Sequence, residues 1–244
     1  MVRGVALLVL AACGRLGFGT DAAPGDSGGG GGGDGSAAAP PALVTAMAAA
    51  QFMTTSLSTG AIDVAEGTTL IAAIACHACK QTASVASITG GGATWNQIAA
   101  GPAGGIGGSE VIWIYLGTDV TAGSTTVSIA TTVSDDFEMT VSEWSGLTGA
   151  VDTSGMLLTD SGATAVAPTL VTTHASDVVY VAAVGFPGNL PGGTTSDGST
   201  FLPGSELEEP LAAAYRIVTT TGTYAPTWAM QSPTYAVGAA FEGY

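Results

Sequence analysis

Short apolar runs separated by turn residues dominate the sequence after Pro41. Examples are residues 69–75, 84–88, 110–116, 125–131, 137–144, 177–184 and 211–218, with Gly, Asp, Ser or Pro between them. These runs have the length of β-strands and are too short for typical helices. Only 9% of the residues are charged, so helices stabilised by surface ion pairs are not favoured. The pattern predicts an all-β fold, namely a two-sheet antiparallel β-sandwich or jelly roll over residues 42–244.

An internal repeat divides this domain into two similar halves, at about residues 42–150 and 151–244. The turn and apolar strand that begin at Glu66 parallel the turn and apolar strand that begin at Ala175. Residues 111–146 match residues 212–243 in the same way, because each stretch has an aromatic strand, a Gly-containing turn and a final strand. We expect the two halves to contribute strands to shared sheets rather than to form independent domains.

The chain is strongly acidic, with 4 Lys and Arg against 19 Asp and Glu and a formal net charge of -15 at pH 7. Nucleic acids and anionic membrane surfaces repel such a chain, so neither is expected as a partner. Most of the carboxylates are interpreted as a solvated surface that keeps the protein soluble. Divalent-cation binding is the alternative.

Residues 1–12 have the pattern of an export signal peptide. Arg3 supplies the positive charge, and residues 5–10 form an apolar segment too short to span a bilayer. Leu10-Ala11-Ala12-Cys13 resembles the lipobox of bacterial lipoproteins. This resemblance implies lipidation of Cys13 and a membrane partner through the lipid. In that family, Gly14 after the cysteine implies an outer-membrane location, at the cell surface or on the periplasmic face. The alternative is an ordinary secretory leader, with Cys13 as a stray thiol.

The segment from Cys13 to Pro41 predicts a disordered Gly-rich tether. It is rich in Gly, Ala and Asp, and it cannot bury enough apolar surface to offset the entropy of ordering. Its start resembles the tethers of myxobacterial-type surface lipoproteins. Residues 25–29 match the nucleophile segment of chymotrypsin-like proteases around Ser27. We reject that activity, because a nucleophile needs a rigid turn beside a base.

Four segments of the domain resemble an uncharacterised family of secreted bacterial β-sandwich modules. These segments are residues 68–75, 87–95, 120–127 and the sequence Glu143-Trp144-Ser145-Gly146. Ala93 stands where the family prefers asparagine. The resemblance covers about residues 43–244 and implies a jelly-roll-like fold, and the family supplies no catalytic residues to transfer.

Cys76-His77-Ala78-Cys79 is the most distinctive local motif. Two neighbouring cysteines in an exported protein tend to oxidise, so we predict a disulfide between Cys76 and Cys79. A metal site, which would need two further ligands, and free buried thiols are the alternatives.

Several carboxylates are candidates for chemistry. Asp135, Asp136 and Glu138 are weak candidates for a calcium site, with Asp119 or Asp152 as a further ligand, against a solvated loop. No cofactor is expected, and calcium is the alternative. Glu143 is expected to be a partly buried carboxylate that accepts backbone hydrogen bonds. His174 precedes a turn, where a lone histidine is usually solvated.

Aromatic residues suggest a sugar-binding surface. Trp95, Trp113, Tyr115 and Tyr215 are candidates for a ligand platform, because aromatic rings stack on sugars. The alternative is core packing, since alternate residues of the strand at 111–116 make both of its faces apolar.

The sequence therefore predicts a non-enzymatic cell-surface lipoprotein module for adhesion, or for binding an extracellular glycan, matrix or protein. The alternatives are a polysaccharide-acting hydrolase or lyase that uses acidic residues such as Asp135, Asp136 and Glu138, and a purely structural envelope protein.

Overall fold

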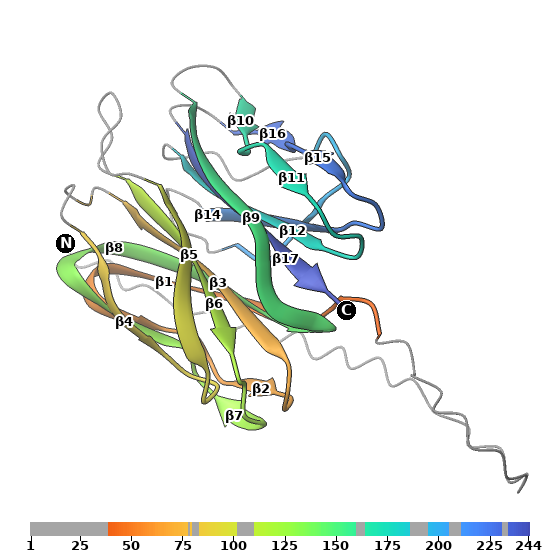
Figure 1. Cartoon of the computed structure of the whole chain (residues 1–244). Coiled ribbons are helices and arrows are strands. Elements are labelled where there is room, and N and C mark those ends of the chain that lie inside the picture. Colours follow the sequence, from red (N-terminus) through yellow and green to blue (C-terminus); the bar gives the residue numbers. More distant parts are fainter. Residues whose placement is uncertain are drawn as a thin grey trace, which may run out of the picture. The chain divides into compact units, whose positions relative to one another are not determined.

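Antiparallel β-strands form the regular structure of the described chain. The computed structural model describes residues 39–77, 79, 83–101, 110–159, 164–185, 195–204, 211–230 and 234–244. The strands of the first half are β1 (Ala42–Ser58), β2 (Ile62–Val64), β3 (Thr69–His77), β4 (Val85–Thr89), β5 (Thr94–Gly101), β6 (Val111–Thr118), β7 (Gly123–Thr125) and β8 (Ser128–Ser145). Those of the second half are β9 (Leu147–Thr159), β10 (Thr164–Val166), β11 (Leu170–Thr172), β12 (Val178–Gly185), β13 (Thr200–Phe201), β14 (Leu211–Ile217), β15 (Gly222–Tyr224), β16 (Thr227–Ala229) and β17 (Thr234–Gly243). The all-β sandwich prediction is confirmed (Figure 1).

The predicted leader, Cys13 and the glycine tract up to residue 38 lie outside the described residues. Within the part of the chain that is described, no helix is long and apolar enough to cross a membrane.

The two halves build main sheets with the same strand order. The first-half sheet runs β1-β8-β3-β6-β5, with β4 also paired to β8, and the second-half sheet runs β9-β17-β12-β14-β13. The small strand pairs β2–β7 and β11–β15 occupy equivalent chain positions. In the first half, β2 precedes β3 and β7 follows β6, and in the second half β11 precedes β12 and β15 follows β14. The expectation that the halves share sheets is wrong, because each final strand, β8 or β17, pairs back within its own half. The change from one sheet to the next occurs at Gly146, slightly before the expected boundary.

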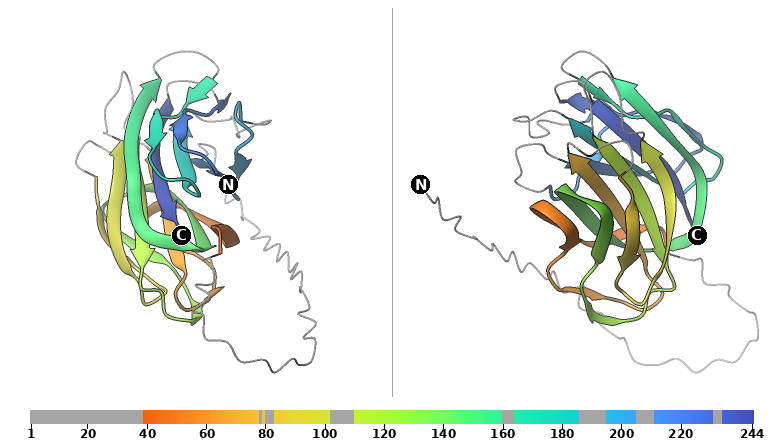
Figure 2. Two further views of the ribbon diagram at one scale, coloured as in Figure 1. Left: turned by 45° about the vertical axis from the view of Figure 1, so that its right-hand side comes forward. Right: turned by 90° about the vertical axis from the view of Figure 1, so that its left-hand side faces the viewer.

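Three apolar cores separate layers of strands. The central core lies between the two main sheets, which face each other in Figures 1 and 2. The first outer core lies on the other face of the first-half sheet, and the second outer core on the other face of the second-half sheet. The halves therefore share a core instead of a sheet, and each also encloses a core of its own.

Burial on both faces explains why the apolar runs are nearly continuous. Every residue of β3 is buried. Ile71 faces the central core, whereas Leu70 and Ile74 face the first outer core. In β12, Tyr180 faces the central core and Val181 the second outer core. Because both faces of such a strand lie against an apolar core, neither face is exposed to solvent, and the usual alternation of apolar and polar residues disappears.

Bulges bend β1 and β8 and let them close the first outer core. The register between β1 and β8 shifts between Gln51 and Thr54 and again between Thr54 and Ser56. Met53, at this bend, has a left-handed backbone with φ of 48°. Beyond it, Leu57 pairs with Ile129, and both are buried in the first outer core. A bulge that increases strand twist is a common way to fold one ribbon over another.

The sandwich has two distinct ends. At one end, which we call the entry end, the chain arrives at Ala39–Pro41 beside Gly146 and Gly243. A Cβ on Gly146 would lie 2.6 Å from the Pro40 carbonyl oxygen, and one on Gly243 would lie 2.5 Å from the Pro41 ring. The orange start of the described chain accordingly lies next to the end of β17 in Figure 1. At the opposite end, which we call the far end, β3 finishes and His77 pairs with Asp136.

We predict that shortening a side chain in the central core lowers stability strongly. Ile114 on β6 is fully buried there, so Ile114→Ala should lower the free energy of unfolding by about 2–5 kcal/mol. Val171 on β11 is 54% exposed, and Val171→Ala should change it by about 0.5 kcal/mol or less. Urea denaturation measures both values. An equal effect of the two substitutions would contradict the shared central core.

Candidate functional site

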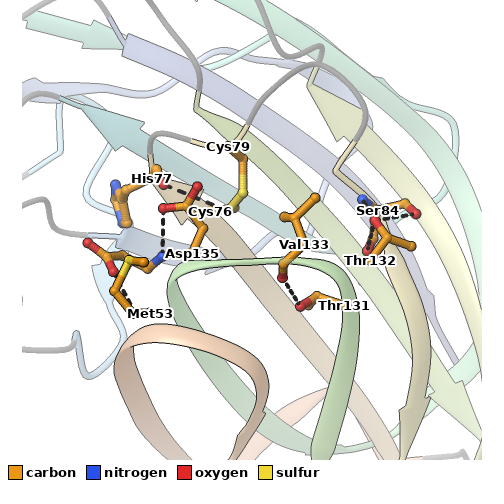
Figure 3. Close-up of a disulfide and its surroundings, with 10 residues drawn as sticks. Met53, Cys76, His77, Cys79, Ser84, Thr131, Thr132, Val133 and Asp135 are labelled. Atoms are coloured by element: carbon orange, nitrogen blue, oxygen red, sulfur yellow. Dashed lines mark hydrogen bonds between the residues drawn. A yellow bond between two sulfur atoms is a disulfide. The ribbon is translucent and has the colours of Figure 1, made fainter.

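A disulfide closes the far end of β3. Cys76 and Cys79 are bonded, their Cα atoms are 5.7 Å apart, and both residues are buried (Figure 3). This separation lies in the normal range for a disulfide. The bond predicted from the sequence is thus present, and its sulfurs are not available as thiolate ligands for a metal.

The three acidic residues beside this disulfide contact different partners. Asp136 Oδ1 accepts a hydrogen bond from the Met53 amide at 2.8 Å, which ties β8 to the bend of β1. Asp135 Oδ1 accepts one from the Asp136 amide at 3.0 Å. Glu138 is fully buried and accepts the Leu211 amide, across the central core. Asp135, Asp136 and Glu138 therefore each accept a hydrogen bond from a different backbone amide, and these contacts do not support the calcium alternative.

His77 joins Glu138 in a buried polar pair. The Nε2 atom of His77 lies 3.7 Å from Glu138 Oε1, and the two side chains are 3% and 0% exposed. Burial lowers the pKa of His77 to about 4, and the nearby Asp136 charge offsets only part of this effect. His77 is therefore neutral at pH 7. The pairing of β3 with β8 brings His77 beside Glu138, and the sequence around His77 does not predict this contact.

Of the two interpretations of the aromatic residues, core packing is the one that the structure shows for Trp113 and Tyr115. Trp113 and Tyr115 are buried in the first outer core, where the Tyr115 hydroxyl donates to Gln97 Oε1 at 3.0 Å. Trp95 is half-buried and donates its indole N–H to the Gly90 carbonyl at 3.2 Å.

Tyr215 lies on the opposite face of the equivalent strand. It packs edge-on against Trp144, with ring centroids 4.8 Å apart, beside the central core. In register Tyr215 opposes Tyr180, just as Leu116 opposes Ile71 in the first half. Tyr215 therefore corresponds to Leu116 and not to Trp113 or its alternate neighbour, so the candidate rings could not share one surface.

Glu143 behaves as expected from its place on the strand. It is fully buried, and its Oε1 accepts the Ala65 amide at 2.7 Å and the Thr68 hydroxyl at 2.9 Å. These bonds hold the turn that precedes β3. Glu143 thus stabilises the entry end of the first half.

A second polar cluster at the entry end was not predicted as a unit. Asp152 on β9 accepts the Thr173 hydroxyl at 2.6 Å and also the Thr173 amide. His174 Nδ1 lies 3.6 Å from Asp152 Oδ1 and 3.6 Å from Glu242 Oε1. The Asp177 carboxylate is close enough that Asp152, His174 and Asp177 each offer a ligand atom within 4.8 Å of the others. We call Asp152, His174, Asp177 and Glu242 the entry-end cluster.

No residue spacing in the sequence predicts this cluster. Asp152, the turn at 173–177 and Glu242 are far apart along the chain, and only the pairing of β9 and β12 with β17 brings them together. The His174 side chain is 53% exposed, in line with a turn position, but it has two carboxylate neighbours.

The two aspartates of this cluster have opposite pKa shifts. Burial raises the pKa of Asp177 to about 7, and the adjacent Asp152 carboxylate acts in the same direction. Burial also acts to raise the pKa of Asp152, but hydrogen bonds from Thr173 outweigh it and hold the value below the usual range. The fold therefore keeps Asp152 charged directly beside a carboxyl group that resists ionisation.

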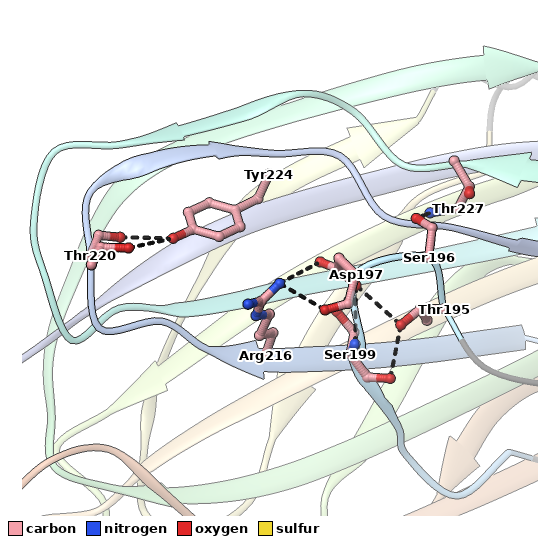
Figure 4. Close-up of polar contacts among 8 residues, drawn as sticks. All are labelled: Thr195, Ser196, Asp197, Ser199, Arg216, Thr220, Tyr224 and Thr227. Carbon is pink, nitrogen blue, oxygen red and sulfur yellow. Dashed lines mark hydrogen bonds and ion pairs between the residues drawn. The ribbon is translucent and has the colours of Figure 1, made fainter.

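A third polar group serves a turn of the second half (Figure 4). Asp197 Oδ1 accepts hydrogen bonds from the Ser199 hydroxyl at 2.7 Å and the Thr195 hydroxyl at 3.1 Å. Arg216 donates to the Asp197 carbonyl at 2.7 Å and lies 5.7 Å from the centre of the Tyr224 ring. Arg216, one of the few basic residues of the protein, thus holds the turn at Asp197 against β14.

Comparison of the chain with protein-family models, with curated proteins and with solved structures found no match. The resemblance to lipoproteins and to secreted β-sandwich modules therefore stays a prediction.

We predict that His77 makes the domain acid-sensitive. Since the folded protein binds fewer protons at His77 than the unfolded chain between pH 6.5 and about 4, its contribution is complete above pH 6.5 and is lost as the pH falls. The loss between pH 7 and 4 should be roughly 2–3 kcal/mol. Urea denaturation of wild type and His77→Gln across this range measures it.

The variant should show a shallower fall in unfolding free energy below pH 6.5, and the same slope as wild type above pH 7. Parallel curves for the two proteins over the whole range would contradict a buried neutral imidazole at this position.

Proposed function

We propose that this protein is a lipid-anchored, non-enzymatic module that presents its far end to an extracellular glycan. The anchor would be the acylated Cys13, and residues 14–38 would act as the tether. The binding end would be the end of the sandwich opposite the point where the chain enters.

The bend of β1 is the observation that supports this choice. Phe52 and Met53 are 57% and 72% exposed, and the Met53 amide bonds to Asp136 at the far end. Met53 also adopts a left-handed backbone, which is uncommon for a residue other than glycine and is often retained at functional positions. An exposed aromatic ring next to polar groups is the usual arrangement for stacking on a sugar.

Charge narrows the class of glycan. With 19 Asp and Glu against 4 Lys and Arg, the protein would repel a polyanionic polysaccharide. A neutral glycan of the cell surface or matrix fits this surface better.

The hydrolase or lyase alternative gains less support. Glycoside hydrolysis by a carboxyl pair needs both groups to reach the substrate. Glu138 is fully buried and bonded to the Leu211 amide, and Asp136 is bonded to the Met53 amide. Both groups are therefore engaged in holding the fold.

The glycan proposal predicts that Phe52→Ala weakens binding. The full chain with Cys13→Ser would be tested on a glycan array and against whole-cell polysaccharide, and loss of a stacked ring should reduce affinity about tenfold. Tyr244→Ser is the matched control, because Tyr244 is 65% exposed at the entry end. Equal binding by Phe52→Ala and wild type, or no glycan bound by either, would contradict the proposal.

The anchor is tested separately. Cells that express wild type or Cys13→Ala would be labelled with a clickable fatty acid. We expect label on the wild-type protein alone, together with its recovery in the membrane fraction. Label that persists on Cys13→Ala would rule out Cys13 as the acylated residue.

A further inference from the structure

The two halves hold equivalent turns in different ways. Trp144 pairs with Thr69 in the first half and Phe241 pairs with Val178 in the second, so these pairs define equivalent positions. By this register Asp177 stands where Thr68 stands in the first half. Ala240 likewise stands where Glu143 stands.

Because of these two replacements, the second half lacks the hydrogen bond that fixes the equivalent turn in the first half. There, the Thr68 hydroxyl donates to Glu143 Oε1 at 2.9 Å. At the equivalent place in the second half, Asp177 is an acceptor and Ala240 has no polar group. Within the described residues, no N–H or O–H group donates to either Asp177 side-chain oxygen, and the residue is fully buried.

The neighbours of Asp177 are also ligands rather than donors. Asp152 offers a carboxylate that is only 5% exposed, and Glu242, which also lies near His174 Nδ1, offers a second carboxylate that is 25% exposed. A buried carboxylate that faces further carboxylates is costly unless a cation or a proton lies between them.

We infer that Asp152, His174 and Asp177, with Glu242, bind one divalent transition-metal cation of the Zn²⁺ type. The separations from His174 Nδ1 to Asp152 Oδ1 and to Glu242 Oε1 are both 3.6 Å. Two ligands of a tetrahedral Zn²⁺ ion lie about 3.3 Å apart, since each bond is about 2.0 Å long. Asp152, His174 and Asp177 each offer a ligand atom within 4.8 Å of the others, so small side-chain rotations would bring these three around one ion. Glu242 would need a larger movement to add a fourth ligand.

The donor types favour this class of cation over Ca²⁺. Calcium takes oxygen ligands, whereas the imidazole of His174 suits zinc and its neighbours in the first transition row. Thr173 adds the outer support that such sites usually have, because its hydroxyl and amide both hold the Asp152 carboxylate in place.

The bound cation would cross-link three elements of the second half. Asp152 lies on β9, His174 and Asp177 flank the turn before β12, and Glu242 lies at the end of β17. A Cβ on Gly243 would meet the Ser176 carbonyl of the same turn, so the elements are already in close contact. The cation would hold the turn before β12 in the second half, as Glu143 holds the turn before β3 in the first half.

The test uses the full chain with Cys13→Ser, purified without a histidine tag and treated with a chelator. Calorimetric titration with ZnCl₂ should show one Zn²⁺ per chain, and the melting temperature should rise with added Zn²⁺. Asp177→Asn should bind Zn²⁺ at least about tenfold more weakly. The exposed Asp63 on β2 supplies a control of equal charge change, and Asp63→Asn should bind like wild type.

Folding of the variant is checked without metal. Asp177→Asn should be at least as stable as metal-free wild type, because it removes the repulsion between two carboxylates. Zn²⁺ binding by Asp177→Asn that equals wild type, or no Zn²⁺ bound by folded wild type, would overturn the site. Tighter binding of CaCl₂ than of ZnCl₂, unchanged in His174→Ala, would overturn the assignment to a transition metal.

Discussion

Burial of the central strands on both faces is the constraint on which the rest of the structure depends. β3 and β12 each lie between two apolar cores, so their residues are apolar on both sides, and the two main sheets can stack face to face. Small residues such as Ala73, Ala182 and Ala239 line the central core and allow close approach of the sheets. The buried carboxylates Glu138, Glu143 and Asp177 accordingly lie toward the two ends of the sandwich. The disulfide and the His77–Glu138 pair are at the far end, and the carboxylate clusters hold turns at the entry end.

The halves diverge most where polar side chains replace each other at these ends. The first half supplies two protein donors to Oε1 of its buried Glu143, whereas the second half places Asp177 among further acceptors. The two halves thus have the same strand order but fix the turn before their fully buried strand, β3 or β12, in two different ways. At the far end the halves are joined instead by the bond from the Leu211 amide to Glu138.

The sequence was sufficient for the class of fold and for local features, and less so for groups assembled by the fold. Strand-length runs predicted the all-β sandwich, and the spacing of Cys76 and Cys79 predicted their disulfide, because both are local properties. The burial of His77 and the entry-end cluster depend on contacts between segments distant in the chain. The face on which Tyr215 lies could not be predicted for a similar reason, since it is set by register with Tyr180 and a one-residue offset reverses a side chain.

Native-state hydrogen exchange tests the shared central core most directly. If the two halves depend on one core, the slowest amides of β3 and β12 should exchange only through global unfolding, with the same free energy and the same denaturant dependence. Exchange of β12 through an opening several kcal/mol below that of β3 would contradict this account, because it would show that the second half unfolds while the first remains folded.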